Sequence, residues 1–284
     1  MARLWGSCGR ARQAGDSGRD TVARQPACRR RGQGVVMEFR LLGAVRAEVP
    51  ARTLVVTSGR ARALLAALSW RPREFVADDL LIDRIWGGSV PGDPRDALYT
   101  AAKRLRRVLR AHSPVGWVVR QRGGYLLDAD PQRIDVHRFR ALVTRAGAAP
   151  DRAAAGHYDE AMRLWAPVPL ADVEGVWAER VRRALSAEWL AARVAGIEVE
   201  LRLGRHAQLI PALRELAWDH PLDERITALL MRALYHDGRR AEALDTYLRS
   251  RRTLVEAVGD EPGPLLRRVH ADILQSAPEP VAPR

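Results

Sequence analysis

Hydrophobic and polar positions follow two different periods along this chain of 284 residues. Between residues 39 and 58 the apolar positions alternate in short runs, which favours strands, and afterwards they recur three and four positions apart, which favours amphipathic helices. The first predicted strands are Phe39–Leu42, Val45–Val49 and Leu54–Thr57. Three predicted helices follow, at Arg60–Ser69, Asp78–Trp86 and Arg95–Ala111. Two further strands are predicted at Trp117–Arg120 and Tyr125–Leu127. Gly123-Gly124 separates these last strands and favours a hairpin turn. This order predicts a winged helix-turn-helix domain over residues 37–130.

The chain from Asp135 onward is helical in character and repeats itself. Gly204-Arg205-His206-Ala207 is matched by Gly238-Arg239-Arg240-Ala241 at an offset of 34 residues, and Gly156-His157-Tyr158 is interpreted as an earlier copy. A period of about 34 residues is typical of tetratricopeptide helix pairs, in which each hairpin covers the apolar face of its neighbour. We therefore predict an all-α, tetratricopeptide-like repeat domain over residues 135–275. The predicted fold class is mainly α with a small β component.

The two ends of the chain lack such patterns. Residues 1–36 carry eight arginines among Gly, Ala and Ser and have almost no periodic apolar positions, which predicts a disordered Arg-rich extension. Met37 stands directly before the first predicted strand, so a second interpretation stays open, in which translation starts at Met37 and the upstream segment is not translated. Residues 276–284 are predicted to form a flexible tail.

Positive charge is concentrated in the N-terminal half. The chain has 47 Lys and Arg against 34 Asp and Glu, a formal net charge of +13, and residues 1–130 contribute +12 of it. Such an excess favours a polyanionic partner, either nucleic acid or an acidic membrane surface. Lys103 is the only lysine, so arginine is used almost everywhere and its number alone carries little information. The positions of the charges are more informative.

The third predicted helix has an apolar side and a cationic side. Between Arg95 and Arg122 there are eight basic residues and one acid, Asp96, whereas an ordinary solvated helix interleaves both signs. On a helical wheel the apolar side consists of Leu98, Ala101, Ala102, Leu105, Val108 and Leu109. The opposite side suits a DNA major groove, where Arg and Lys reach guanine and where Tyr and Thr contact thymine methyl groups. The other interpretation is a solvated surface on which the general arginine bias inflates the charge.

We expect the polar residues of this region to contact double-stranded DNA in three ways. Base reading is assigned to Tyr99, Thr100, Lys103 and Arg107, phosphate anchoring to Arg104, Arg106 and Arg110, and phosphate or minor-groove contact at the hairpin to Arg120 and Arg122. Trp117 and Tyr125 lie in alternating strand runs, so they are predicted to pack in the core.

No catalytic, metal or cofactor site is predicted. Cys8 and Cys28 have no partner thiols or histidines at zinc-ligand spacing, and the seven histidines are scattered. G-x-S-x-G, H-E-x-x-H and phosphate-loop signatures are absent from the sequence, so an enzyme is not expected. No apolar run is long enough to span a membrane and the N-terminus lacks a signal-peptide core, so we expect a cytoplasmic protein that associates with the nucleoid and not with membranes.

Several segments resemble a known family. Those in the first domain are Leu80-Leu81-Ile82-Asp83-Arg84-Ile85-Trp86-Gly87, Asp96-Ala97-Leu98, Arg104-Leu105-Arg106-Arg107 and Gly124-Tyr125-Leu126-Leu127. They resemble the OmpR/PhoB-like winged helix of the Streptomyces antibiotic regulatory proteins. The segments Asp135-Val136-His137-Arg138-Phe139, His220-Pro221-Leu222, Gly238-Arg239 and Glu261-Pro262-Gly263-Pro264 resemble the bacterial transcriptional activator domain that follows it. The resemblance covers about residues 37–275, and its short form, without an appended ATPase, fits best.

The resemblance implies a transcriptional activator of a secondary-metabolite gene cluster. Such proteins bind direct repeats near promoters and contact RNA polymerase or its sigma factor, and a homodimer on DNA is a further expectation. The turn between the second and third helices would then face polymerase; it consists of Trp86, Gly87, Gly88, Ser89, Val90, Pro91, Gly92, Asp93 and Pro94. The alternative is a Gly- and Pro-rich connector with no partner.

Two departures from the family pattern and two rival functions stay open. Ala77 stands where the family has a hydroxyl residue before the second helix, so a cap is missing unless Asp78 takes that role. Tyr99-Thr100-Ala101-Ala102 also differs from the family, so the DNA target cannot be carried over. The rivals are a helical-repeat scaffold for protein interactions and a ligand-responsive repressor on the same fold. The concave face of the repeats has room for a small molecule or a second subunit.

Overall fold

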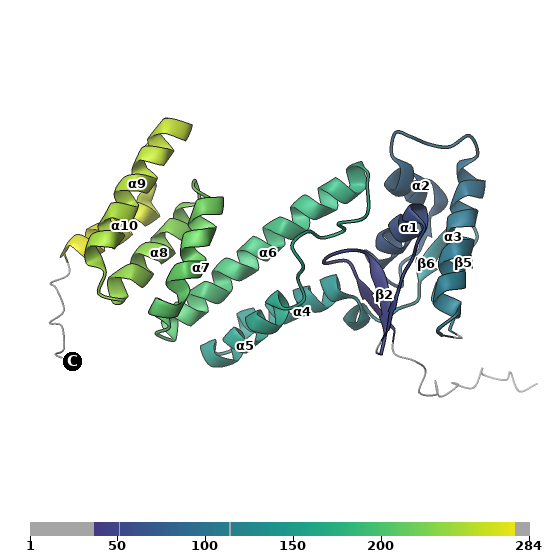
Figure 1. Ribbon diagram of the computed structural model, residues 1–284, viewed down its shortest axis with the longest axis horizontal. Helices are drawn as coiled ribbons and strands as arrows, with labels where there is room; N and C mark the ends of the chain where they lie inside the picture. The colour runs from purple at the N-terminus through teal and green to yellow at the C-terminus, as the bar shows by residue number, and fades with distance from the viewer. Residues whose placement is uncertain (1–36, 51, 114, 276–284) are drawn as a thin grey trace, which may run out of the picture. The chain divides into compact units, whose positions relative to one another are not determined.

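Two antiparallel sheets and ten α-helices make up the part of the chain that the computed structural model describes, which is residues 37–50, 52–113 and 115–275 (Figure 1). The predicted Arg-rich extension at residues 1–36 and the predicted tail at residues 276–284 lie outside these described residues. The predicted fold class, mainly α with a small β component, is confirmed.

The first sheet consists of β1 (Glu38–Arg40), β2 (Arg46–Val49) and β3 (Arg52–Leu54), in that order and antiparallel throughout. Phe39 is opposite Ala47, and Ala47 is opposite Leu54, and all three side chains are buried. Because side chains alternate across a strand, this register places one apolar row on the core face.

Three helices follow, α1 (Gly59–Ser69), α2 (Asp78–Trp86) and α3 (Pro94–Arg110), and α1 packs against both of the others. The hydroxyl of Ser58 accepts a hydrogen bond from the backbone N–H of Ala61, and this bond caps the start of α1. The start of α2 has no side-chain cap, as Ala77 predicts. Asp78 does not replace the cap, because its carboxylate accepts hydrogen bonds from Arg120 instead.

The second sheet has the order β4-β6-β5, with β4 (Val76–Ala77), β5 (Val118–Gln121) and β6 (Gly124–Leu127). The hairpin between β5 and β6 turns at Arg122 and Gly123, and Gly123 has a φ of 80°. The predicted turn at Gly123-Gly124 is therefore displaced by one residue. Gly124 lies inside β6, where a Cβ atom would come within 2.3 Å of the carbonyl oxygen of Val76, so only glycine fits.

The rest of the described chain is helical and is preceded by a short 3₁₀ turn at Pro131–Arg133. Its helices are α4 (Asp135–Ala148), α5 (Asp151–Met162), α6 (Val176–Arg202), α7 (His206–Asp219), α8 (Glu224–His236), α9 (Arg240–Val258) and α10 (Pro264–Gln275). Neighbours in sequence pack as antiparallel hairpins, for example α4 with α5 and α7 with α8.

Two of the three predicted repeat copies occupy equivalent places. Gly204 and Gly238 both have a φ of 79° and each precedes a helix of the stack, α7 and α9 respectively. This backbone conformation is one that glycine adopts without a steric penalty, which explains why the motif begins with glycine. Gly156 instead lies within α5, so the interpretation of Gly156-His157-Tyr158 as a third copy is wrong. The resemblance there is one of composition, because a helix interior uses the same residue types.

Apolar side chains form two cores in the described residues. The first extends from Met37 to Val199 and the second from Val194 to Ile273, so α6 contributes to both. The predicted boundary between residues 130 and 135 does not coincide with a gap in the first core. The division into domains at residues 37–130 and 135–275 remains a prediction.

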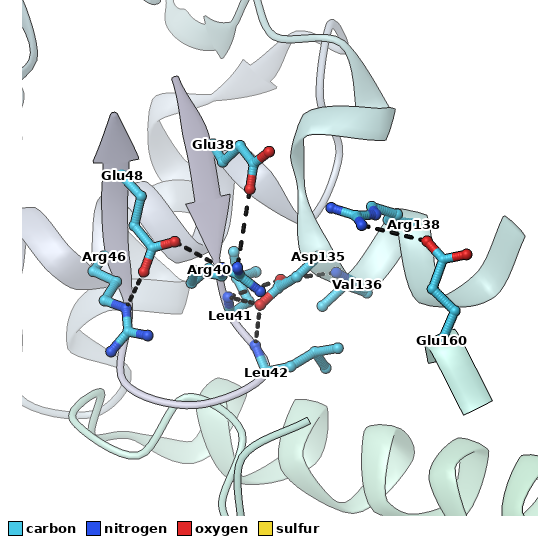
Figure 2. A network of polar contacts seen from close by, with 10 residues as sticks. All are labelled: Glu38, Arg40, Leu41, Leu42, Arg46, Glu48, Asp135, Val136, Arg138 and Glu160. Carbon is cyan, nitrogen blue, oxygen red and sulfur yellow. Dashed lines mark hydrogen bonds and ion pairs between the residues drawn. The ribbon is translucent and has the colours of Figure 1, made fainter. Parts of the chain in front are cut away.

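Asp135, the first residue of α4, connects the helical region to the first sheet (Figure 2). Its carboxylate accepts hydrogen bonds of 2.8–2.9 Å from the backbone N–H groups of Leu41, Leu42 and Val136. Only 4% of Asp135 is exposed. Burial raises the pKa of this carboxyl group to about 6, although the three N–H donors act in the opposite direction.

Candidate nucleic-acid interface

Helix α3 separates its apolar and polar residues as the helical wheel predicts. Asp93 caps its N-terminus by accepting a hydrogen bond from the backbone N–H of Asp96, and Pro94 is its first residue. The side chains that are buried on its inner face are Leu98, Ala101, Ala102, Leu105 and Leu109. Because these residues pack against α1 and the sheet region, the orientation of the outer face is fixed.

The outer face of α3 presents cations that no described residue neutralises. Lys103, Arg104, Arg107 and Arg110 are all exposed and have no ion-pair or hydrogen-bond partner among the described residues. Tyr99 precedes them with 55% of its surface exposed, and Thr100 is half-buried beside it. The acids Asp93 and Asp96 lie at the first turn, so the free positive charge is on the C-terminal two-thirds of the helix.

Arg106 and Arg120 differ from these residues, because their guanidinium groups are engaged within the chain. Arg106 donates from Nε to the carbonyl oxygen of Val118 at 2.9 Å, which connects α3 to β5. Arg120 donates two hydrogen bonds, of 2.5 and 2.9 Å, to the carboxylate of Asp78 at the start of α2, and these bonds raise the pKa of its guanidinium group. Both cations also lie over the ring of the buried Tyr125, at 5.4 and 4.5 Å.

The hairpin β5–β6 carries one free cation at its tip. Arg122 is exposed in the two-residue turn and has no ion-pair partner among the described residues. The carbonyl oxygen of the adjacent Gly123 accepts a hydrogen bond of 2.8 Å from the backbone N–H of Asp78, which holds the tip against α2. Trp117 and Tyr125 are buried, at 6% and 1% exposure, so the prediction that they pack in the core is confirmed.

The turn predicted to face polymerase is mostly exposed. Val90 is 49% exposed and Gly88, Ser89 and Gly92 are also exposed, whereas Trp86 is half-buried against the first core beneath the guanidinium of Arg60. Asp93 and Pro94 belong to the start of α3. The surface that a partner can reach is therefore the segment from residue 87 to residue 92.

Two cations near this interface were not predicted from the sequence. The side chain of Arg95, in the first turn of α3, is 75% exposed, and its one ion pair within the described part of the chain is a 3.6 Å contact with Asp79, which is 84% exposed. Arg52 of β3 lines the same surface hollow as Arg107 and Val108 of α3. Arg95 was within the counted cluster of charge, but Arg52 is 55 positions away from Arg107 and no sequence pattern relates the two.

Other kinds of site receive no support from the described residues. They contain no group of three His, Cys, Asp or Glu side chains placed to hold a metal ion. Cys8 and Cys28 lie outside the described residues. No described helix is both long enough and apolar enough to cross a membrane.

A unit of two small sheets, three helices and a hairpin, followed by helical hairpins, is the architecture of winged-helix proteins that carry a helical-repeat domain. A model of the bacterial transcriptional activator domain matches residues 134–274. The transcriptional regulator RedD of Streptomyces coelicolor is 34% identical over 253 residues, which cover 86% of this chain and 72% of RedD. The regulatory protein DnrI of Streptomyces peucetius is 31% identical over 254 residues, which cover 85% of this chain and 93% of DnrI. The chain belongs to the Streptomyces antibiotic regulatory protein family, and it is a transcriptional regulator.

Two further relatives are longer than this chain. The regulatory protein AfsR of Streptomyces coelicolor is 36% identical over 248 residues, which amount to 85% of this chain but only 24% of AfsR. The solved structure of Mycobacterium tuberculosis EmbR, in complex with a low-affinity phosphopeptide, matches with a TM-score of 0.79 and 28% identity over 84% of this chain and 65% of the EmbR chain. This match confirms the predicted fold class. The printed names of these relatives are those of regulatory proteins.

Proposed function

We propose that this protein is a sequence-specific DNA-binding regulator whose helix α3 enters the major groove. The observation that carries the proposal is the set of unneutralised cations Lys103, Arg104, Arg107 and Arg110 on one face of a helix whose other face is buried. A helix of this kind positions basic side chains against base edges and phosphates at the same time. Solvated surface helices instead carry both signs.

We propose the following division of roles along α3. Tyr99, Thr100, Lys103 and Arg107 are proposed to read bases, with Lys103 and Arg107 donating to guanine and the other two contacting thymine methyl groups. Arg104 and Arg110 are proposed to bind phosphates, and Arg122 to reach phosphates or the adjacent minor groove from the hairpin tip. Because Arg106 and Arg120 are engaged with Val118 and Asp78, we now assign them the positioning of the hairpin and not contact with DNA.

The regulatory role is proposed from the relatives. We infer activation of a secondary-metabolite gene cluster through binding of promoter direct repeats, with a homodimer on the DNA and localisation to the nucleoid in the cytoplasm. The exposed segment of residues 87–92 is proposed to contact RNA polymerase or its sigma factor. In this division residues 37–130 bind DNA and present the segment that contacts polymerase, and residues 135–275 bind the partner subunit.

The test combines binding-site selection in vitro with occupancy in the cell. The purified full chain selects sequences from random duplex DNA, and genome-wide occupancy is then compared with transcript levels after deletion of the gene. We expect a selected motif that repeats in one direction and that lies at promoters whose transcripts fall on deletion. Transcripts that rise would make the protein a repressor, and failure to select any motif would favour a helical-repeat scaffold.

A further inference from the structure

Three consecutive helices of the repeat region enclose a surface hollow of about 550 Å³. Helices α7, α8 and α9 lie side by side (Figure 1), and each contributes to the wall. Its lining is Arg214, Ala217, Trp218, Pro221, Thr227, Leu230, Thr246, Arg249, Ser250 and Thr253. A volume of this size is in the range of small-molecule sites in proteins.

The lining of the hollow includes a hydrogen-bonding group without a partner among the described residues. Ser250 is 9% exposed, and its hydroxyl is buried without any hydrogen-bond partner. The neighbouring hydroxyls of Thr227 and Thr246 each donate to the backbone carbonyl four residues earlier, at 3.3 and 2.8 Å. Ser250 alone among these three residues therefore retains a free proton to donate. A buried polar group without a partner is costly, and a ligand oxygen would satisfy it once the Ser250 side chain turns its hydroxyl, which is covered in this structure, toward the hollow.

The charges that line the hollow are positive. Arg214 and Arg249 are in the lining, which contains no carboxylate. Arg249 donates to the hydroxyl of Thr246, which also lines the hollow, at 3.4 Å. Both arginines also pair with acids outside the lining, Glu242 and Asp245, in contacts whose side chains are 46–61% exposed. Exposed pairs of this kind contribute little, so either guanidinium can turn to a ligand anion at small cost.

One wall of the hollow is apolar and includes the most exposed large hydrophobic residue among those described. Trp218 is 86% exposed, and the other apolar lining residues are Ala217, Pro221 and Leu230. An indole ring left in water at this position offers a face for stacking by a flat ligand. The same hollow thus combines an aromatic surface, two guanidinium groups and one free hydroxyl donor.

From this combination we propose that the hollow between α7, α8 and α9 binds a small aromatic carboxylic acid. The ring stacks on Trp218, and the carboxylate accepts hydrogen bonds from Arg249 or Arg214 and from the Ser250 hydroxyl. The proposal concerns a face remote in sequence from α3, and it holds or fails independently of DNA binding.

Titration calorimetry on the purified full chain tests the proposal with indole-3-acetate as the probe and the uncharged indole-3-acetamide as its matched partner. We expect saturable 1:1 binding of the acid and binding of the amide that is weaker by about 10-fold, the size of one charge-assisted hydrogen bond. This comparison uses the unaltered chain, so it does not depend on how any variant folds.

Variants then locate the site. Arg249→Gln should weaken binding by about 10-fold and Ser250→Ala by about 3-fold or more, whereas Arg252→Gln, an exposed arginine of α9 outside the lining, should leave it unchanged. The absence of saturable binding, equal affinity for acid and amide, or binding that neither lining variant weakens would overturn the proposal. Preference for the tripeptide acetyl-Ala-Ala-Trp over indole-3-acetate would overturn it in favour of a peptide-docking groove.

Discussion

Arg106 and Arg107 are adjacent in sequence, and their guanidinium groups have different surroundings. Arg106 is half-buried and bonds to the carbonyl oxygen of Val118, whereas Arg107 is exposed without a partner among the described residues. A change of one position turns a helical side chain by about 100°, which is enough to move it from the hairpin to the outer face. The sequence predicted both residues as DNA contacts. A helical wheel gives the direction in which each side chain leaves the helix, but it does not show where a neighbouring strand lies.

This pair gives a matched prediction at the scale of single residues. Arg106→Ala should lower the free energy of unfolding by about 1–2 kcal/mol, because Val118 loses a donor and Tyr125 loses a cation. Arg107→Ala should leave stability within about 0.5 kcal/mol and weaken DNA binding. Urea unfolding and DNA titration of both variants provide the measurement. If Arg106→Ala were the more stable protein of the two, the structural role assigned to it would be wrong.

Among the elements, the hairpin β5–β6 has the strictest steric requirement. Gly124→Ala should destabilise the protein by about 1–3 kcal/mol or more, because the new Cβ would clash with the carbonyl oxygen of Val76 and with the ring of Phe75. Gly92→Ala is the control, since a Cβ there meets nothing within 4 Å. Thermal unfolding of both variants checks the prediction. Equal melting temperatures for the two would show that the hairpin does not pack as described.

The start of α2 offers a stabilising change. Ala77 has an extended backbone at the helix N-terminus and no capping side chain, so Ala77→Ser should supply the missing acceptor. We expect an increase of about 0.5–1 kcal/mol in the free energy of unfolding by urea, with no change in its denaturant dependence. A neutral or destabilising result would mean that Asp78 and Asp79 already satisfy the free N–H groups of the first turn.

Periodicity predicted most of the elements because each helix and strand has one buried face. Helices α2 and α3 begin and end within one residue of the predicted bounds, and Trp117 and Tyr125 are buried as expected. The misplaced turn and the third repeat copy at Gly156 have a different origin. Both depended on glycine as a sign of a turn, whereas Gly124 is required by the close approach of Phe75 and Val76, which lie far away in the sequence.

At the scale of the whole molecule, Asp135 connects the first sheet to the helical region, and its pKa of about 6 has a testable consequence. The carboxyl group titrates near 3.9 in an unfolded chain, so the folded state holds its proton more tightly. The contribution of the protonated Asp135 carboxyl group to the free energy of unfolding is therefore greatest below pH 4 and is lost as the pH rises through 6.

The stability difference between the natural protein and Asp135→Asn should accordingly shift by about 1 kcal/mol in favour of the natural protein between pH 7 and pH 5. Burial lowers the pKa of the nearby His137, so the contribution of this side chain to stability changes with pH in the opposite direction. His137 is present in both proteins, so its contribution cancels in the difference between them. Urea unfolding at the two pH values gives the measurement. A difference that is constant with pH would show that Asp135 stays ionised in the folded state.

The interface and the hollow depend on tertiary placement to different degrees. Lys103 and its neighbours were predicted from the sequence because one helix carries them all. Arg52 and the lining of the hollow were not, since segments far apart in the chain bring those side chains together. Sequence reasoning allowed for a ligand on the concave face of the repeats, but it could not name Ser250 or Trp218 as parts of the hollow.

The central claim is that α3 reads DNA, and salt-dependent binding of Lys103→Ala and Arg110→Ala tests it most directly. Binding of the full chain to the selected operator, and to single-base variants of it, is titrated over a range of salt concentrations. Arg110→Ala should weaken binding to all sequences about equally and lower the salt slope by about 1, whereas Lys103→Ala should also remove about 1–3 kcal/mol of preference at one base pair. Equal effects of the two substitutions on every sequence, or none, would contradict the account.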